Sequence, residues 1–230
     1  MEDLTKLADV TTATVTMVLL KKGLRNVWLR GTRPLQAGQK RVVGRAFTLR
    51  FLPGREDLAT PESLASGRST RAAIEAMPDG SVIVIDAMGT LDAGVFGDIL
   101  CARMKMRGVA GMVTDGVVRD VAGVLGVGLP VWCQGVAAPP SVSGLTFAGW
   151  QEPIGCGGVA IYPDDVIVAD DDGAVVIPKA LVGDVLAAAP EQERLEAWIM
   201  AEVERGVPLL GLYPPNAEAM ARYKAGNGAG

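Results

Sequence analysis

One stretch of this sequence constrains the fold more than any other: an apolar run, a glycine-rich loop, a helical segment and a second apolar run. Residues 81–86, SVIVID, are β-branched and apolar, which predicts a strand buried on both faces. The loop AMGTLDAGVFG leads to a helix expected over about 98–107, and GMVTDGVVRD opens with another strand. Strand, helix and strand in this order form a βαβ unit with parallel strands. The fold class is therefore α/β.

The remaining elements extend this unit. Helices are expected over 3–22, 70–77 and 179–206, the last kinked at Pro190, and strands over 42–51, over 129–135, around Val142 and over 157–178, where Asp171-Asp172-Gly173 turns a hairpin. Residues 53–69 form a long polar loop, and GNGAG at the end is expected to be a frayed tail. No internal repeat and no linker is visible, so the 230 residues are expected to form a single domain.

The most restrictive feature of the composition is that the chain has no histidine. Ser-His-Asp and Cys-His nucleophiles are excluded, and so are zinc sites built on imidazole. Proton transfer must use a carboxylate, Lys, Tyr, Cys or water. A metal, if there is one, is expected to be a hard, oxygen-liganded ion such as Mg²⁺ or Mn²⁺.

Charge and cysteine content narrow the partners and the compartment. The net charge is −4 with no basic run, so the electrostatic footprint of a nucleic-acid-binding protein is missing. The three cysteines show no paired spacing, which fits a reduced, cytoplasmic protein. No apolar stretch approaches the length of a membrane span and no signal-peptide pattern is present, so no membrane partner is expected.

Arg119 and Asp120 stand side by side where the second strand of the βαβ unit ends. Asp86 and the glycine-rich loop after it lie at the end of the first strand, and Asp115 lies at the end of the second with the Arg-Asp pair. Ligands gather at the carboxyl ends of parallel strands, so these groups are expected to converge. Arg119 could fork onto a substrate carboxylate while Asp120 holds a cation. From the residues alone, a solvated salt bridge is an equally good interpretation.

The second candidate is the start of the helix at Gly97-Asp98. Free N–H groups in a first helical turn attract anions, and Gly89, Gly94 and Gly97 would allow close approach to the backbone. The alternative is that Gly97 only permits the turn and Asp98 caps its own helix. The glycines match neither the dinucleotide fingerprint nor a Walker A sequence.

Other polar or apolar groups have ordinary interpretations. The acidic residues at 164–165 and 170–172 lack calcium-loop spacing and are interpreted as turns. Lys105 is interpreted as a solvated lysine, and Leu195, Trp198 and Ile199 as core or subunit interface. Three arginines flank the long loop and could meet a distal acid group of a substrate, with solvent as the default: Arg55, Arg68 and Arg71.

Two segments resemble the RraA-like family, which includes the regulator of ribonuclease activity A and the 4-hydroxy-4-methyl-2-oxoglutarate/4-carboxy-4-hydroxy-2-oxoadipate aldolases. GDILCARMKMRGVAGMVTDGVVRD has the family's Gly-Asp and Arg-Asp pairs, with twenty residues between Asp98 and Arg119. GGVAIYPDDVIVADDDGAVVIP is similar to the family's second hallmark. The resemblance predicts a single RraA-like domain over 1–230, with a core at about 5–206 and a C-terminal extension over 207–230.

The resemblance implies an α/β sandwich of the swivelling β/β/α type, assembled as a homotrimer or hexamer with active sites between subunits. It implies retro-aldol cleavage of a 4-hydroxy-2-oxo acid to pyruvate, often with oxaloacetate decarboxylation, and Mg²⁺ or Mn²⁺ as cofactor. The implied residue roles are catalysis by Arg119 and Asp98, metal binding by Asp120, and substrate binding by Arg119 and the backbone of Gly97, Asp98, Ile99 and Leu100. A pyruvate enolate can be stabilised by a divalent ion and a guanidinium, so this chemistry needs no histidine.

The sequence departs from the family pattern in two places. Aldolase members usually carry Glu or Asp three residues after the Arg-Asp pair, where this chain has Gly123. The loop over 53–69 is longer than usual and could alter the substrate. Two alternatives to the aldolase therefore stay open: a protein-binding regulator of an RNA-processing enzyme, and a lyase or dehydratase of sugar-derived 2-oxo acids.

Overall fold

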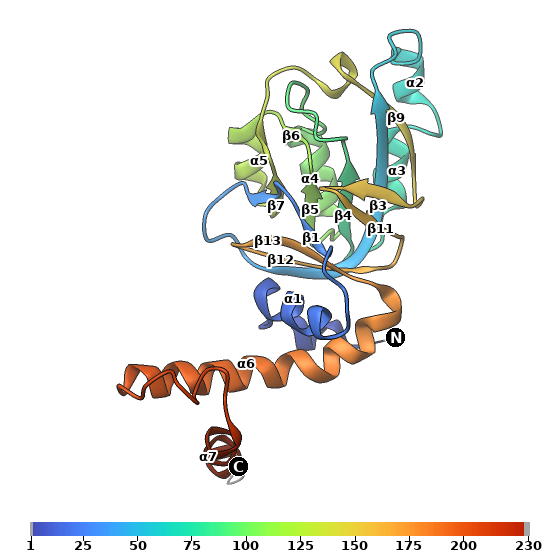
Figure 1. Cartoon of the computed structure of the whole chain (residues 1–230). Helices are drawn as coiled ribbons and strands as arrows, with labels where there is room; N and C mark the ends of the chain where they lie inside the picture. Colours follow the sequence, from blue (N-terminus) through green and yellow to red (C-terminus); the bar gives the residue numbers. More distant parts are fainter. Residues whose placement is uncertain (1, 228–230) are drawn as a thin grey trace.

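The computed structural model describes residues 2–227, and its central feature is one mixed nine-stranded sheet organised around the long strand β3 (Val42–Pro53) (Figure 1). The first part of β3 pairs antiparallel with β12, and its middle pairs parallel with β4. Its last residues pair antiparallel with β9 across a bulge between Arg50 and Phe51. The strand order is β1-β13-β12-β3-β4-β5-β7-β2, with β9 beside β3. β3 therefore joins the parallel part of the sheet, where the candidate site lies, to an antiparallel part.

The strands of this sheet, in addition to β3, are β1 (Trp28–Leu29), β2 (Arg33–Pro34), β4 (Val82–Asp86), β5 (Gly111–Thr114), β7 (Val131–Cys133), β9 (Leu145–Trp150), β12 (Val166–Asp170) and β13 (Gly173–Ile177). Two small sheets pair β6 (Val117–Val118) with β8 (Gly135–Val136) and β10 (Ile154–Cys156) with β11 (Val159–Ile161). The helices are α1 (Thr12–Lys21), α2 (Pro61–Ala65), α3 (Thr70–Ala76), α4 (Asp98–Met106), α5 (Val121–Val127), α6 (Val182–Glu204) and α7 (Ala217–Asn227). Three 3-10 turns complete the list: η1 (Leu4–Leu7), η2 (Ser141–Ser143) and η3 (Lys179–Leu181).

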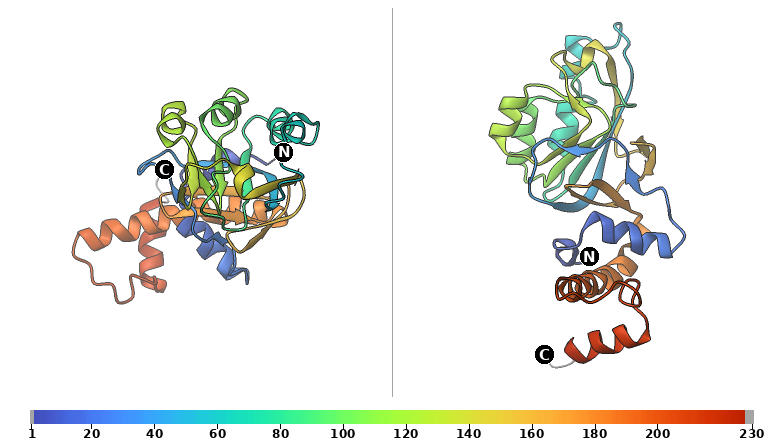
Figure 2. Two further views of the ribbon diagram at one scale, coloured as in Figure 1. Left: turned by 90° about the horizontal axis from the view of Figure 1, so that it is seen from above. Right: turned by 60° about the vertical axis from the view of Figure 1, so that its left-hand side comes forward.

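Helices cover both faces of the sheet. The helices α3, α4 and α5 line one side, and α1 lies between the other side and α6 (Figures 1 and 2). Each side has its own buried cluster: the first centres on Phe47, Ile83 and Met104, and the second on Val15, Val168 and Val185. Burial of these apolar side chains is the main stabilising contribution to such a layered fold.

The predicted βαβ unit and hairpin are confirmed. β4 and β5 pair in parallel, Val82 opposite Gly111, with α4 between them in sequence. β12 and β13 pair antiparallel, with Asp170 opposite Gly173 around the predicted turn. The mixed α/β fold therefore agrees with the prediction from the sequence.

Three expected elements need correction. The helix expected over 3–22 is two elements, η1 and α1. The backbone is extended at Thr11, where a new helix begins, and the Thr11 side chain caps this helix by accepting from the N–H of Thr14. The stretch around Val142 is not a strand but η2, and the strand follows it as β9. The loop over 53–69 contains α2, which Thr60 and Ser63 begin with a reciprocal capping box.

At the C-terminal end, α6 runs continuously from Val182 to Glu204 with Pro190 inside it, so the proline does not break the helix. The segment after α6 folds back, and Trp198 of α6 packs at 5.6 Å, ring centroid to centroid, from Tyr223 of α7. Ile199, Leu212 and Ala219 form a third small buried cluster there. Of the apolar residues predicted on α6, Ile199 is therefore buried within the chain, and Leu195 and Trp198 are partly buried. Of the expected frayed tail, residues 228–230 lie outside the described residues.

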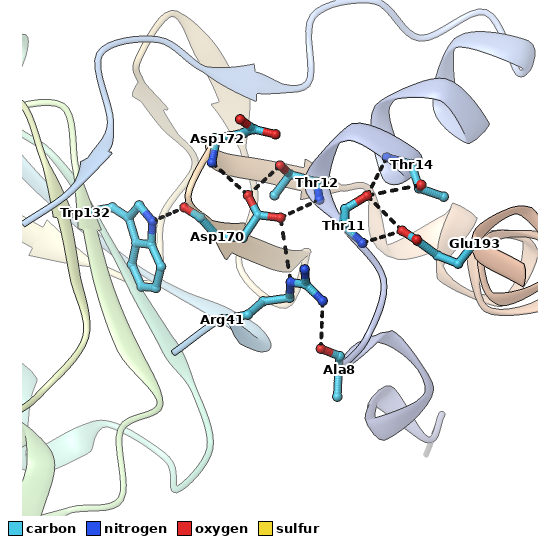
Figure 3. Close-up of polar contacts among 9 residues, drawn as sticks. All are labelled: Ala8, Thr11, Thr12, Thr14, Arg41, Trp132, Asp170, Asp172 and Glu193. Carbon is cyan, nitrogen blue, oxygen red and sulfur yellow. Dashed lines mark hydrogen bonds and ion pairs between the residues drawn. The ribbon is translucent and has the colours of Figure 1, made fainter. Parts of the chain in front are cut away.

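The acidic hairpin tip is a structural device that fixes α1 (Figure 3). Asp170 accepts hydrogen bonds from the backbone and hydroxyl of Thr12 at 2.8 and 2.7 Å, and lies 3.6 Å from Nε of Arg41. Trp132 donates its indole N–H to the Asp170 carbonyl at 2.6 Å. Glu193 of α6 accepts from the backbone and hydroxyl of Thr11. Asp170 lies at the hairpin turn that its sequence context predicted, and Asp170 and Glu193 both act as long-range caps of α1, which the sequence did not predict.

No helix among residues 2–227 combines the length and the apolar character that a membrane crossing requires.

Candidate functional site

The candidate site forms where the glycine-rich loop of residues 87–97 runs beside β6. The N–H of Val95 donates to the carbonyl of Val117 at 2.8 Å, and the N–H of Arg119 donates to the carbonyl of Phe96 at 3.0 Å. These backbone bonds place the start of α4 directly against the Arg119-Asp120 pair. The loop and the pair, which the sequence predicted to converge, do lie together.

Two glycines are required for this close approach. A Cβ on Gly94 would lie 2.8 Å from the backbone nitrogen of Arg119, and a Cβ on Gly97 would lie 2.5 Å from Oδ2 of Asp120. Real Cβ atoms do not come so close to other heavy atoms, so any larger residue would push the Arg-Asp pair away. Both glycines therefore shape the site, whereas Gly89 lies away from the pair, near Gln134.

Arg119 and Asp120 form an ion pair that leaves most of their binding capacity free. Nε of Arg119 lies 3.0 Å from Oδ2 of Asp120, and the two side chains are 35% and 42% exposed. The Nε–H finds no acceptor in hydrogen-bonding geometry among residues 2–227. Asp120 has a left-handed backbone, with φ 53° and ψ 44°, which is uncommon for a residue other than glycine. Backbone strain of this kind is often found at functional sites.

Asp98 opens α4 and partly satisfies the helix N-terminus itself. Its Oδ1 accepts from the N–H of Ile99 at 2.7 Å, while the N–H groups of Asp98 and Leu100 have no partner among residues 2–227. The backbone N–H groups expected to bind an anion over 97–100 are thus only partly available. Asp98 caps its own helix in part and leaves part of the helix start free for an anion. The start of a helix still favours negative charge.

Gly123 lies against Asp98. A Cβ on Gly123 would be 2.5 Å from Oδ2 and 2.7 Å from Cβ of Asp98. The Asp98 carboxylate therefore fills the space into which any larger side chain at position 123 would project. The chain lacks the acid that the family pattern has at position 123, but the carboxylate of Asp98 lies close to that position.

A pocket of about 360 Å³ opens over these groups. It is lined by all the site residues predicted from the sequence, Gly97, Asp98, Ile99, Leu100, Arg119 and Asp120, together with Leu64, Thr70, Arg71, Gly94, Val95, Phe96, Pro140, Ser141 and Val142. The predicted residues thus share one concave surface, which is the usual setting of a small-molecule site. Thr70, Ser141 and the residues beside them were missed, because no local pattern marks residues that tertiary folding alone brings to a pocket.

Of the other polar candidates, one lines the pocket and the rest lie outside it. Arg71 lines the pocket and has no ion pair among residues 2–227, whereas Arg55 is paired with Asp57 at 2.5 Å. Lys105 donates to the carbonyl of Val127 and lies on the outer part of α4. Asp86 and Asp115 do not line the pocket, which corrects the expectation that they would join Arg119.

Asp115 instead anchors two loops. It is 5% exposed and accepts from the N–H groups of Ala87 and Gly157 at 2.8 and 3.1 Å. Burial raises the pKa of its carboxyl, against the effect of these hydrogen bonds. Burial likewise raises the pKa of the Cys101 thiol on α4 to about 12, and the nearby Asp98 adds to the shift. Cys101 is therefore a protonated core residue and no nucleophile.

The donor set is compatible with a magnesium-type ion but not with an all-protein cage. Among residues 2–227 no cluster of three or more Cys, Asp or Glu side chains could hold one ion. Asp120 and Asp98 offer hard carboxylate oxygens at the pocket wall. Mg²⁺ commonly binds through one or two carboxylates and keeps several waters, so these two residues fit it.

Comparison with known proteins places this arrangement in a family. A family model described as RraA-like, Aldolase/RraA, matches residues 6–176. A Halalkalibacterium halodurans protein with the provisional name 4-hydroxy-4-methyl-2-oxoglutarate aldolase is 36% identical over 161 residues, which are 70% of each chain. Protein DlpA of Legionella pneumophila is 34% identical over 175 residues, 74% of this chain but only 27% of DlpA.

Solved structures agree. The crystal structure of Streptomyces coelicolor RraAS2, described as an unusual member of the RNase ES inhibitor RraA protein family, matches with a TM-score of 0.76 and 35% sequence identity. The match covers 85% of this chain and 93% of that one. The chain belongs to the RraA-like family.

Proposed function

We propose that this protein is a divalent-metal-dependent carbon–carbon lyase that cleaves a 4-hydroxy-2-oxo acid to pyruvate, and that it also decarboxylates oxaloacetate. One observation carries the proposal: a partly free guanidinium, a carboxylate and the start of a helix line the same pocket. The relationship to a protein named as an aldolase supports the same reaction class.

Each residue has a distinct role in this proposal. The terminal nitrogens of Arg119 bind the pyruvyl carboxylate in a fork, and the free N–H groups of Asp98 and Leu100 assist at the start of α4. Asp120 would hold Mg²⁺ or Mn²⁺, with Asp98 beside it. When bound, the metal supplies positive charge for the oxygen on which the enolate forms. Gly97 and Ile99 line the same wall.

The reaction balances without histidine. Water next to Arg119 accepts the proton of the C4 hydroxyl, and the bond between C3 and C4 breaks. C4 leaves as a carbonyl compound, and the electron pair of the broken bond passes into a pyruvate enolate. Arg119 stabilises the enolate charge, and the proton returned to C3 completes pyruvate.

A second candidate is a protein-binding regulator of an RNA-processing enzyme. The name of the S. coelicolor relative favours it, and so does Gly123, which removes an acid that the aldolase pattern usually has. Such a regulator has no need of a metal-dependent pyruvate-binding pocket.

A pyruvate-release assay distinguishes the two candidates. Purified protein should release pyruvate from at least one of a panel of 4-hydroxy-2-oxo acids or from oxaloacetate when Mg²⁺ or Mn²⁺ is present, and EDTA should abolish the release. No pyruvate from any substrate with either metal would favour the regulator.

A further inference from the structure

A second pocket continues the candidate site toward the long loop. Its volume is about 250 Å³, and it shares Leu64, Thr70, Ser141 and Val142 with the first pocket. A ligand anchored at Arg119 could therefore extend past these four residues without leaving a protein surface. The second pocket is built partly from α2 and the loop before it, the segment that is longer than the family pattern.

Two hydroxyl groups mark the junction of the pockets. Thr70 is only 6% exposed, and its hydroxyl has no hydrogen-bond partner among the described residues. Ser141 lines both pockets, and its hydroxyl is also without a partner in that part of the chain. Neither hydroxyl oxygen is among the buried atoms without a partner, so both are accessible and can exchange hydrogen bonds with a polar group of a ligand.

Beyond the junction the pocket is mostly apolar. Phe51 and Phe147 meet edge to face at 5.3 Å between ring centroids, and Leu145 is 1% exposed beside them. Of the neighbouring hydroxyls, Ser69 caps α3 and Thr146 accepts from the N–H of Arg55, so each already has one partner within the chain. The aromatic and aliphatic part of the wall suits a carbon chain.

The one cation that lines the second pocket is Arg68. Its side chain forms no ion pair or hydrogen bond among residues 2–227. Arg68 and Glu152 both reach the space beside Gly149, but their side chains do not form an ion pair. By contrast, Arg55 on the same loop is satisfied by Asp57 at 2.5 Å. A guanidinium without a carboxylate partner at the end of an apolar pocket is suited to an anion.

We infer that the second pocket is a specificity subsite for the C4 substituent of the substrate. It selects 2-oxo acids whose chain beyond C4 is several carbons long, apolar along its length and ended by a carboxylate that Arg68 binds. Thr70 and Ser141 receive the C4 hydroxyl at the junction. The inference rests on the proposed function for the position of the pyruvyl end, and it adds which substrates the site prefers.

Binding of unreactive probes tests the subsite independently of turnover. Without a C4 hydroxyl, 2-oxosuberate, 2-oxooctanoate and 2-oxobutyrate cannot undergo retro-aldol cleavage. Calorimetric titration of the full chain with Mg²⁺ present should show 2-oxosuberate binding at least about fivefold more tightly than 2-oxooctanoate, and 2-oxooctanoate more tightly than 2-oxobutyrate.

Three variants assign the preference to Arg68. Arg68→Gln should remove the advantage of 2-oxosuberate over 2-oxooctanoate, Arg68→Lys should keep most of it, and the matched control Arg55→Gln should leave it unchanged. Equal wild-type affinities for all three acids would overturn the subsite while leaving the pyruvate-release result intact. A preference that survives in Arg68→Gln would overturn the role of Arg68, and no binding of any of the three acids would contradict the subsite and the pyruvyl site together.

Discussion

At the scale of single residues, the neighbouring positions of Arg119 and Asp120 are what make them useful together. Nε of Arg119 lies 3.0 Å from Oδ2 of Asp120 without hydrogen-bonding geometry. An exposed pair of this kind contributes only about 0–1 kcal/mol to stability. Its proposed value is orientation, since it keeps the guanidinium beside Asp120 with both terminal nitrogens available to a substrate carboxylate.

The first prediction follows from that orientation. Arg119→Lys should lower kcat/KM about 30- to 1000-fold, because an ammonium keeps the charge but cannot reproduce the two-pronged contact. The measurement is steady-state pyruvate release on the best substrate of the panel. Arg103→Lys is the matched control, since Arg103 pairs with Glu75 on the outer side of α4 and should change activity less than twofold. A threefold or smaller effect at Arg119 would reduce it to a surface partner of Asp120.

The second prediction concerns Gly123. Replacing an exposed helical glycine with alanine normally stabilises a helix by roughly 0.5–1 kcal/mol, and Gly126→Ala in the same helix should do so, because nothing lies within 4 Å of its added Cβ. Gly123→Ala should destabilise the protein instead, by about 1–3 kcal/mol, because its Cβ would meet Asp98 at 2.5 Å. Urea unfolding of both variants gives the comparison. Equal stabilisation by both would show that Asp98 moves freely.

At the scale of elements, α1 depends on carboxylates distant in sequence. Partial burial raises the pKa of Glu193, but the hydrogen bonds from Thr11 and Thr14 together with the charge of Arg41 outweigh it, and the net shift is downward from 4.5. A carboxylate whose pKa is lowered in the folded state contributes fully to the free energy of unfolding when the pH is above its ordinary pKa. This contribution is lost as the pH falls through the folded-state pKa.

The third prediction uses that sign. Between about pH 6 and pH 3, wild type should lose more unfolding free energy than Glu193→Gln, because the variant has no carboxylate to protonate. Glu196→Gln on the same helix is the control, since its carboxylate accepts from Gln192 of α6 and does not itself cap α1, which Gln192 contacts only through the exposed end of Lys21. Parallel pH profiles for wild type and Glu193→Gln would contradict the cap. Urea titrations at several pH values supply the data.

The sequence predicts the elements that local patterns specify and misses those that long-range contacts specify. The βαβ unit was predictable because burial on both faces leaves a continuous apolar run in SVIVID, and the hairpin because Asp-Gly turns are local. The interruption before α1 was missed because Thr11 is held by Glu193, 182 positions away. Arg119, Asp120 and Asp98 could be selected from their places at strand and helix ends, whereas Thr70 and Ser141 reach the pocket only through tertiary packing.

At the scale of the whole molecule, the surfaces left exposed indicate where subunits could meet. Leu195 and Trp198 of α6 are partly buried against the segment that follows α6, which weakens them as an argument for association. Ile99 and Met106 on α4 are instead 79% and 78% exposed, and Ile99 lies at the rim of the candidate site. Exposed apolar side chains grouped beside a site are typical of interaction surfaces.

The fourth prediction is a homotrimer or hexamer with active sites between subunits. Sedimentation equilibrium at micromolar concentration should give three or six times the 23.9 kDa of one chain, and Met106→Glu should lower the assembled fraction. The far-ultraviolet circular dichroism of the variant should stay that of wild type, because Met106 is a surface residue. A wild-type monomer would contradict sites shared between subunits.

The central claim is that Asp120 belongs to a metal-dependent pyruvate site and is more than the partner of Arg119. Asparagine at position 120 keeps the shape of the side chain and removes the charge that a hard cation needs. The direct measurement is calorimetric titration of Mn²⁺, with oxalate present, into wild type, Asp120→Asn and the control Asp184→Asn. The Asp184 carboxylate pairs with Lys22, and neither residue lines the candidate pocket. Mn²⁺ should bind at least tenfold more weakly to Asp120→Asn alone, on the order of 1.4 kcal/mol. Equal affinities in all three proteins would remove Asp120 from the metal site and contradict the account.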